Sequence, residues 1–155
     1  MPTVSASALV AAGAEDAFHF IADYRNIPRL QPHFATAKLV GDVERQVGAE
    51  VELEGRFHGL PMRVHNRIVA YLPPLRLVSV SEGTVLSRST WELQPVSADP
   101  PTTRVTLTVD YKLRGTLGGL FMGVGSALWP LFNMEVQGMT DESLRRLSGF
   151  FAGKA

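Results

Sequence analysis

The longest uncharged stretch of the chain, residues 115 to 134, is the feature that most constrains how the chain folds. At about 1.5 Å of rise per residue, a helix over this stretch would just cross a bilayer core of roughly 30 Å, so a membrane anchor is the first alternative. Five glycines and Pro130 make the stretch a poor membrane helix, and no basic cluster flanks it to fix an orientation. The sequence therefore favours a glycine loop that leads into a helix.

The predicted helix has one continuous apolar face. From Phe121, apolar residues recur every three or four positions to residue 150, which is the spacing of one helical face over about eight turns. The first half is apolar on its other faces too, so a partner or a ligand is expected to cover it. Pro130 is expected either to kink this helix or to mark its start, which would leave residues 116–129 as a partly separate lid.

The rest of the chain predicts two short helices and a series of strands. Residues 3–11 alternate loosely as a first strand, a helix runs from Ala14 to Asp23, and Pro28 and Pro32 bracket a second short helix or turn. Six strands follow, and their one-sided apolar patterns are typical of an antiparallel sheet with one wet face. No linker or repeat interrupts the chain, so one domain over residues 1–155 is predicted.

The hairpin that begins at residue 50 has a predicted register. Residues 58–61 are taken as its turn. With that turn, Glu54 lies opposite His65 and Glu52 lies opposite Arg67 on the outer face of the sheet.

The strand around Trp91 has two possible registers. If Trp91 points inward, Ser87 and Ser89 share its face, and such small hydroxyl side chains leave room there. A slip of one residue at the preceding hairpin would turn Arg88 inward instead, which would place a cation in the pocket and favour an acidic ligand. The sequence leaves both registers open.

Two polar side chains fall on apolar strand faces. Asn66 stands between Val64 and Ile68, in an alternation that continues to Ala70, and burying an unpaired amide is costly. Asn66 therefore either bonds to the backbone or a neighbouring serine, or anchors a ligand carbonyl or hydroxyl. Tyr111 ends the inward series of the last strand, where its hydroxyl serves core packing or ligand contact.

Composition argues against several function classes. The 155 residues carry fifteen basic and fifteen acidic side chains without a basic cluster, so no nucleic-acid partner is expected. The absence of cysteine excludes thiol catalysis, disulfides and cysteine-ligated zinc. The first residues lack the features of a signal peptide, so a cytoplasmic location is the default expectation. Hydrophobic residues make up 45% and charged residues 19%, which suits a protein with an interior surface to line.

Signatures of common enzymes are missing from the sequence. There is no GxSxG, P-loop, complete dinucleotide-binding glycine pattern or HExxH. The four histidines, at positions 19, 33, 58 and 65, fall on different predicted elements and share no ligand spacing. No metal site and no cofactor are therefore predicted.

The segment FIADYRNIPRLQPHFATAKLV resembles the START-related polyketide cyclase/dehydrase and lipid transport superfamily (SRPBCC). The resemblance rests on Asp23, Tyr24, Pro28, Leu30 and Pro32. It continues through the Pro73-Pro74 turn, the ELQP segment that ends at Pro95, the TRVTLTVDY strand and the glycine loop, and so covers essentially the whole chain.

The resemblance implies an α+β helix-grip fold. A strongly bent antiparallel sheet of about seven strands, in the order β-α-α-β6-α, would wrap around the long C-terminal helix and enclose an apolar cavity. It further implies a lipid, isoprenoid or aromatic ligand, and in some branches cyclisation or dehydration chemistry, but it carries no universal catalytic residue onto this chain. It also indicates Phe121, Leu128 and Phe132 as cavity lining.

The predicted function is the binding of a small hydrophobic molecule, with the segment 115–125 gating access. The main alternative is a polyketide cyclase or dehydratase that uses Tyr111, Asn66 or Arg88 for acid-base work. A third is a protein-interaction module, and the chain is expected to be a monomer or a homodimer. The candidate ligand-binding residues are Phe57, Asn66, Ile68, Ser89, Trp91, Leu107, Val109, Tyr111, Phe121, Leu128 and Phe132.

Overall fold

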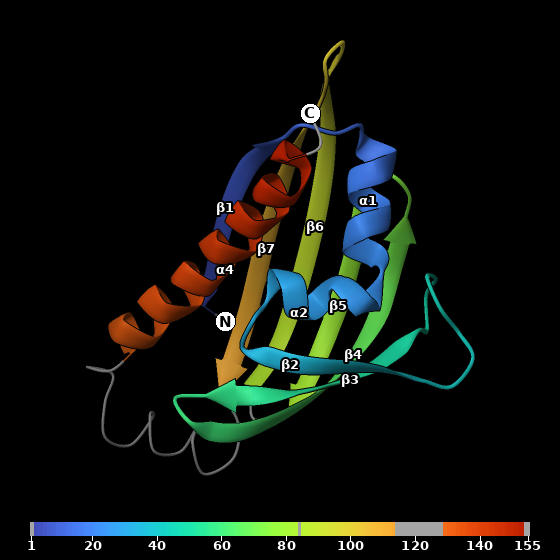
Figure 1. Cartoon of the computed structure of the whole chain (residues 1–155). Helices are drawn as coiled ribbons and strands as arrows, with labels where there is room; N and C mark the ends of the chain where they lie inside the picture. Colours follow the sequence, from blue (N-terminus) through green and yellow to red (C-terminus); the bar gives the residue numbers. More distant parts are fainter. Residues whose placement is uncertain (1, 84, 114–128, 154–155) are drawn as a thin grey trace.

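The computed structural model describes residues 2–83, 85–113 and 129–153, with residues 85, 113 and 129 described by their backbone alone. These residues form an antiparallel sheet that curls beside a long helix at the C-terminal end (Figure 1). The predicted α+β class, with a bent sheet and a long C-terminal helix, is confirmed.

The sheet of the described residues has seven strands in the order β1-β7-β6-β5-β4-β3-β2, and each neighbouring pair is antiparallel. Strands β2 to β7 follow one another both in sequence and in space, because each is joined to the next by a hairpin or a short loop. The strands are β1 (Thr3–Val10), β2 (Phe34–Val40), β3 (Glu50–Phe57), β4 (Leu60–Leu72), β5 (Arg76–Gly83), β6 (Val85–Ala98) and β7 (Pro101–Leu113).

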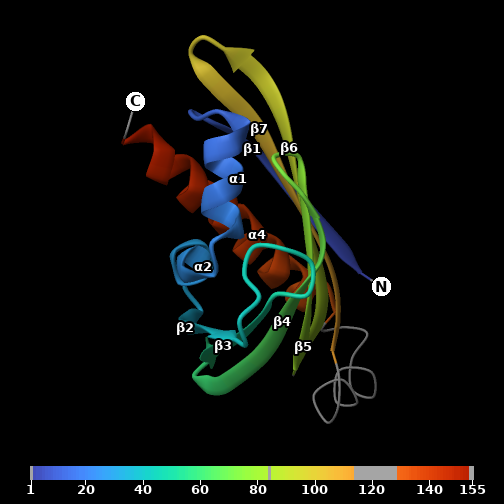
Figure 2. The ribbon, with the colours of Figure 1, turned by 90° about the vertical axis from the view of Figure 1, so that its right-hand side faces the viewer.

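All helices of the described chain lie on one side of the sheet (Figure 2). A helix follows β1, and two short helical segments come after it, where the proline spacing predicted a helix or turn. The expected order of strand, two helices, six strands and long helix is confirmed apart from one extra helical turn. The helices are α1 (Ala14–Ala22), the 3₁₀ helix η1 (Tyr24–Asn26), α2 (Ile27–Leu30) and α4 (Trp129–Ala152).

Helix α4 is described from Trp129 onward, and Pro130 is the second of its described residues. Whether Pro130 kinks a longer helix or marks its start stays a prediction, because the preceding residues lie outside the described part of the chain. The apolar periodicity predicted for residues 121–128, the lid 115–125, and the candidates Phe121 and Leu128 lie outside the described residues.

The predicted register of the β3–β4 hairpin is wrong by two residues. Glu52 pairs with His65 and Glu50 with Arg67, because the turn contains only residues 58 and 59. His58 and Gly59 both have positive φ, 53° and 79°, which is the conformation of a two-residue type I′ turn. A shift of two leaves every side chain on its predicted face.

A bulge in β4 changes which side chains face inward beyond Ile68. The pairing with β5 shifts between Ile68 and Ala70, so the predicted inward position of Ala70 is wrong. Tyr71 packs against the core instead, with its ring centroid 5.3 Å from that of Phe18. An extra residue in one strand reverses the faces that follow it, and the apolar alternation alone does not reveal it.

The register of β6 follows the first of the two alternatives. Trp91 is buried, and Ser87 and Ser89 line the same inner face. Arg88 lies outside the cavity lining and pairs in register with Asp110 on β7. The alternative with Arg88 in the pocket is therefore wrong.

Candidate ligand-binding cavity

The inner face of the sheet, α4 and the segment from α1 to β2 line a partly open cavity of about 190 Å³. Its walls are largely apolar, and three groups of buried apolar side chains in the described chain surround it. One group centres on α1 and the C-terminal half of α4, one on Tyr111 and Phe132, and one on β3 with Phe34. The cavity occupies the space that these groups leave open.

Nine of the eleven candidate ligand-binding residues line this one cavity, although they come from β3, β4, β6, β7 and α4. The other two, Phe121 and Leu128, lie outside the described residues. The structure brings the nine together, and their contact with a ligand stays a prediction. The nine are Phe57, Asn66, Ile68, Ser89, Trp91, Leu107, Val109, Tyr111 and Phe132.

Sequence reasoning missed the wall formed by α1, η1 and α2. Tyr24 and Leu30 belonged to the family-like motif, yet nothing in their spacing showed that they face the cavity. Short irregular helices have no period from which an inner face can be read. The missed lining residues of this wall are Ile21, Ala22, Tyr24, Ile27, Leu30, Gln31, His33 and Phe34.

Asn66 is held by two serines of the neighbouring strand. Its Nδ2 donates to the Oγ of Ser81 at 2.8 Å and lies 3.3 Å from the Oγ of Ser79. The expectation of an asparagine bonded to a neighbouring serine is confirmed, and the same side chain lines the cavity. Within the described chain its amide oxygen accepts no hydrogen bond, and it is not sealed from solvent or cavity.

Tyr111 joins the sheet to the first turns of α4. Its side chain is 1% exposed, and its hydroxyl donates to Oδ1 of Asn133 at 2.5 Å. Burial raises the pKa of Tyr111, so the hydroxyl stays protonated at neutral pH. The ring lies 5.4 Å from that of Phe132, which places a donor and an aromatic wall at the same end of the cavity.

His33 is the titratable group of the described cavity wall whose pKa moves most. Burial lowers its pKa to about 4, so the imidazole is neutral at pH 7. The backbone of His33 sits against Gly55, where a Cβ atom would lie 1.8 Å from the His33 carbonyl oxygen. That carbonyl also accepts from the Arg56 amide at 3.0 Å. Glycine at position 55 therefore lets the chain bring His33 to the cavity.

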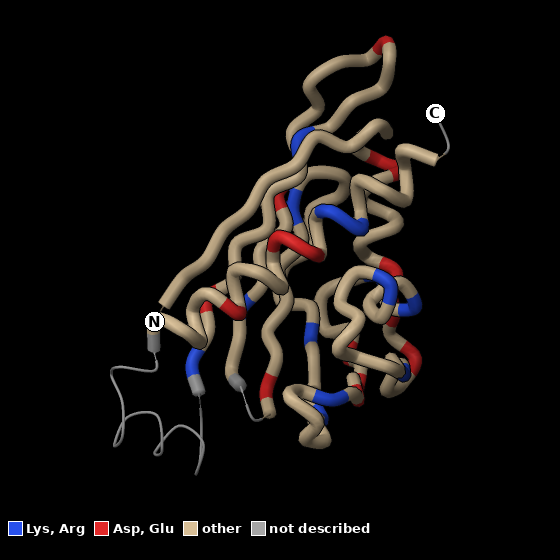
Figure 3. Tube along the Cα trace, turned by 60° about the vertical axis from the view of Figure 1, so that its left-hand side comes forward, with Lys and Arg blue, Asp and Glu red and all other residues tan. Residues whose placement is uncertain are grey.

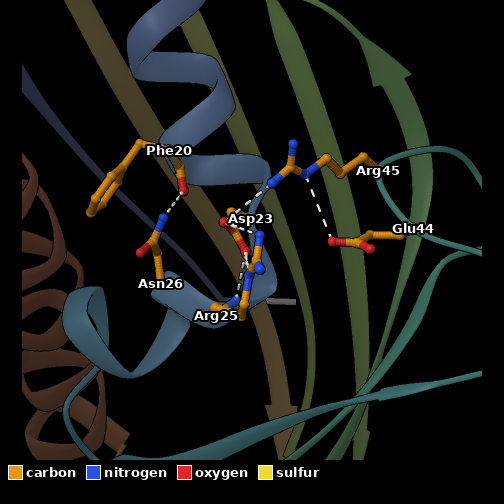
Figure 4. A network of polar contacts seen from close by, with 6 residues as sticks. All are labelled: Phe20, Asp23, Arg25, Asn26, Glu44 and Arg45. Carbon is orange, nitrogen blue, oxygen red and sulfur yellow. Dashed lines mark hydrogen bonds and ion pairs between the residues drawn. The ribbon is translucent and has the colours of Figure 1, made fainter.

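A cluster of charges fixes the α1–η1 turn over the cavity (Figure 4). The carboxylate of Asp23 accepts from Nε and Nη2 of Arg25 at 2.8 and 2.9 Å, and from Nη2 of Arg45 at 3.2 Å. The hydrogen bonds from Arg25 lower the pKa of Asp23. Nδ2 of Asn26 donates to the Phe20 carbonyl at 2.9 Å, which ties η1 back to α1.

The β3–β4 turn meets α4 beside the cavity. Nε2 of His58 lies 2.5 Å from Oε1 of Glu135, and the rings of Phe57 and Phe132 are 6.2 Å apart. Both members of the His58–Glu135 pair are at least one-third exposed, so solvent screens the attraction. The contact nevertheless links the β3–β4 turn to helix α4.

Basic and acidic residues both occur in the described part of the chain. Lysine, arginine, aspartate and glutamate are interspersed along its trace (Figure 3). No group of three histidine or acidic side chains in residues 2–83, 85–113 and 129–153 is placed to hold a metal ion. Nor does any helix in that part of the chain have the length and apolarity needed to span a membrane.

A helix lying across a curled antiparallel sheet, with an apolar cavity between them, defines a class of proteins that enclose small molecules. The family model for "Polyketide cyclase / dehydrase and lipid transport" matches residues 1–148. The chain therefore belongs to this family, and the resemblance found in its sequence is confirmed. No curated protein matches the sequence.

Solved structures show the same helix-grip fold. The protein TTHA0849 from Thermus thermophilus superposes with a TM-score of 0.79 at 19% identity, covering 99% of both chains. A START superfamily protein from Mycobacterium smegmatis gives 0.78 at 14% identity, again over 99% of both chains. The ZhuI aromatase/cyclase from Streptomyces sp. R1128 gives 0.77 at 18% identity, over 99% of this chain and 94% of that one. Identities this low establish the fold alone.

Proposed function

We propose that the protein binds a small hydrophobic molecule, a lipid, an isoprenoid or an aromatic polyketide-like compound, in the cavity beneath α4. The observation that carries the proposal is the partly open cavity itself, about 190 Å³ and lined mainly by apolar side chains. A well-filled interior has no room of this size, because protein cores pack as densely as organic crystals.

Burial of apolar ligand surface supplies the binding free energy. Removing about 200 Å² of ligand surface from water contributes roughly 5 kcal/mol, at about 25 cal/mol for each Å². Trp91, Leu107 and Phe132 offer the apolar contacts, while Asn66 and the serines beside it orient the ligand.

Native mass spectrometry combined with organic extraction tests this function. The protein is purified from its own host or from a lipid-rich lysate and weighed intact. A stoichiometric adduct, whose mass recurs in the organic extract, is the expected result and also gives the ligand class. An adduct-free mass after exposure to lipid, isoprenoid and aromatic extracts would contradict the proposal.

Catalysis in the same cavity is the alternative, with Tyr111 as its candidate acid. The Tyr111 hydroxyl donates to Oδ1 of Asn133 at 2.5 Å, so this bond would have to open before the phenol could give its proton to a ligand. Two of the proteins that share the fold are an aromatase/cyclase and a di-domain ARO/CYC protein. If this protein is a cyclase or dehydratase, Tyr111→Phe should still bind the ligand but lose turnover. A carrier would show no turnover in either protein.

A further inference from the structure

The first half of α4 is held in place by fewer buried side chains than the second half. Within residues 130–139, all of which the structure describes, only the side chain of Phe132 is buried. Phe132 packs with Val4 and Tyr111 in a small cluster, whereas the second half contributes to the largest core cluster. Separating the first half from the sheet therefore exposes less apolar surface than separating the second. The core residues of the second half are Leu144, Leu147 and Phe151.

Three polar contacts also join the first half of α4 to the strands. One reaches β1, one reaches β7 and one reaches the β3–β4 turn. Where such a contact is exposed, water replaces it when it breaks, so its loss costs little. The contacts are that of Gln137 Nε2 with the Ser5 carbonyl at 2.9 Å, that of the Tyr111 hydroxyl with Asn133, and that of His58 with Glu135.

Gly138 lies at the boundary between the two halves of α4. The interior of a helix disfavours glycine, because glycine leaves the helical conformation more readily than any residue with a Cβ atom. A Cβ atom on Gly138 would meet nothing within 4 Å outside the backbone of the helix itself, so no close packing requires glycine here. Glycine at this position therefore adds backbone freedom and nothing else that the packing uses.

Two buried hydroxyl side chains weaken the same part of the helix. The hydroxyl of Thr140 donates to the carbonyl of Val136 at 2.8 Å, and that of Ser143 donates to the carbonyl of Met139 at 3.0 Å. Such bonds to the carbonyl four residues earlier compete with the backbone bonds of the helix and favour bending. The two carbonyls lie on either side of Gly138, so the weakened stretch is centred on it.

We propose that Gly138 is a hinge about which the first half of α4, residues 129–137, swings away from the sheet while the second half stays in its core. Val136 and Met139 line the cavity on either side of Gly138, so the motion widens the opening between α4 and the strands. The motion itself needs no ligand. Its role in admitting a ligand rests on the proposed function.

The reaction rate of a buried thiol measures this motion without a ligand. The sequence has no cysteine, so Val4→Cys and Val10→Cys each give a protein with one thiol. Both valines are buried on β1, but Val4 packs in the cluster of Phe132 and Val10 packs in the cluster of the second half. The rate of modification by a pyridyl disulfide reagent is measured for each variant, alone and combined with Gly138→Ala.

Gly149→Ala is the matched control for Gly138→Ala. A Cβ atom on Gly149 would also meet nothing within 4 Å, but Gly149 lies in the second half of α4. A further variant, Met134→Gly, introduces glycine at an exposed position inside the first half. Circular dichroism and unfolding midpoints show that each variant is folded.

The thiol of Val4→Cys should react faster than that of Val10→Cys, because opening of the first half is enough to expose it. Gly138→Ala should slow the reaction of Val4→Cys about four- to fivefold, since alanine leaves the helical conformation less readily than glycine. Gly149→Ala should leave this rate unchanged. Met134→Gly should also leave it unchanged, because the first half keeps its helical form as it swings.

Three results would overturn the hinge. Equal slowing by Gly138→Ala and Gly149→Ala would mean that the thiol reacts through unfolding of the whole protein. No slowing by Gly138→Ala would assign the exposure of Val4→Cys to fraying of β1. A faster reaction with Met134→Gly would mean that the first half unravels instead of swinging.

Stopped-flow binding of N-phenyl-1-naphthylamine, an uncharged fluorescent probe, connects the motion with ligand access. Gly138→Ala should slow association and dissociation by the same factor, about four- to fivefold, and leave Kd unchanged, because the closed complex is the same. Gly149→Ala should change neither rate. Probe rates that Gly138→Ala left unchanged would overturn the role in ligand access. If the wild-type protein did not bind the probe, the proposed function would fail with that role, whereas the thiol rates alone decide the hinge.

Discussion

The two halves of α4 turn an apolar face toward the same sheet, but only one half meets a filled interior. Toward the C-terminus, Leu144, Leu147 and Phe151 are buried in the largest core cluster. Toward the N-terminus, Val136 and Met139 line the cavity. The same apolar periodicity of α4 thus faces a filled core in one half and a cavity in the other. The residues opposite each half determine which of the two it faces.

Those opposite walls differ in side-chain volume. The C-terminal half of α4 faces aromatic residues of α1, and the rings of Phe20 and Phe150 lie 4.2 Å apart. The N-terminal half faces a floor that includes Ser79, Ser81 and Ser87. Small hydroxyl side chains cannot reach the helix, and the resulting space is the cavity.

The largest expected effect is the loss of a large side chain from the filled half. Leu147 is fully buried, so Leu147→Ala should reduce the free energy of unfolding by about 2–5 kcal/mol. Met139 faces the cavity, and Met139→Ala should cost about 1 kcal/mol because fewer packed contacts are lost. Urea denaturation of both variants measures the difference. Equal losses would show that the two halves are packed alike.

The free energy of unfolding should depend on pH in a way that shows the imidazole of His33, on the cavity wall, to be neutral in the folded protein. The folded state holds the pKa of His33 at about 4, below the ordinary value of 6.5, so its contribution is fully present above pH 6.5. As the pH falls from 6.5 to about 4, His33 becomes protonated in the unfolded chain but stays neutral in the folded one. The free energy of unfolding therefore decreases by about 2–3 kcal/mol.

His33→Gln should remove this part of the pH dependence. Unfolding free energies at pH 7 and pH 4.5 measure it in both proteins, and His19→Gln, at an exposed position, is the control. The same difference between the two pH values in wild type and His33→Gln would contradict the assignment.

Loss of the Asp23 cluster should have a smaller effect. Asp23→Asn removes the charge that accepts from Arg25 and Arg45 and should cost about 1 kcal/mol, because these arginines are partly exposed. The pKa of Asp23 is lowered in the folded state. Its contribution is therefore present above the unfolded pKa of 3.8 and is lost as the pH falls through the folded pKa.

Thermal unfolding at pH 7 and at pH 2 tests that sign. The stability difference between wild type and Asp23→Asn should be clear at pH 7 and vanish at pH 2. A deficit that persisted undiminished at pH 2 would assign the role of Asp23 to packing rather than charge.

The smallest expected effect concerns added volume. Ser89→Val enlarges a side chain that faces the cavity and should change the unfolding free energy by less than about 0.5 kcal/mol, because there is room for it. Val10→Ile adds one methylene at a fully buried position of the filled core and should cost about 1 kcal/mol. If chemical denaturation found Ser89→Val the costlier of the two, the space at the floor would not exist in solution.

The sequence predicted the features that depend on periodicity. The element order, the inward position of Tyr111 and the family followed from strand alternation and motif order, whereas the sequence left open whether Trp91 or Arg88 faces inward. Where one extra residue matters, as at the bulge beyond Ile68, alternation gave the wrong face for Ala70. The two-residue turn at His58 was missed because histidine rarely adopts positive φ, though it does so more often than most residues.

The candidate site was predictable on the strands and not on the short helices. Asn66 stood out because an amide interrupted an apolar alternation, which is a local signal. His33 reaches the cavity only because Gly55, distant in sequence, lets two backbones approach closely. Such a contact leaves no pattern in either segment.

A crystal structure of the protein under xenon pressure would test most directly whether one half of α4 covers space and the other does not. Xenon occupies apolar cavities and is excluded from filled cores. The account predicts xenon density among Trp91, Leu107 and Met139, and none around Leu147. Two results would contradict the account. One is the absence of xenon density among Trp91, Leu107 and Met139 because α4 had closed onto the serines of the cavity floor. The other is equal density there and around Leu147.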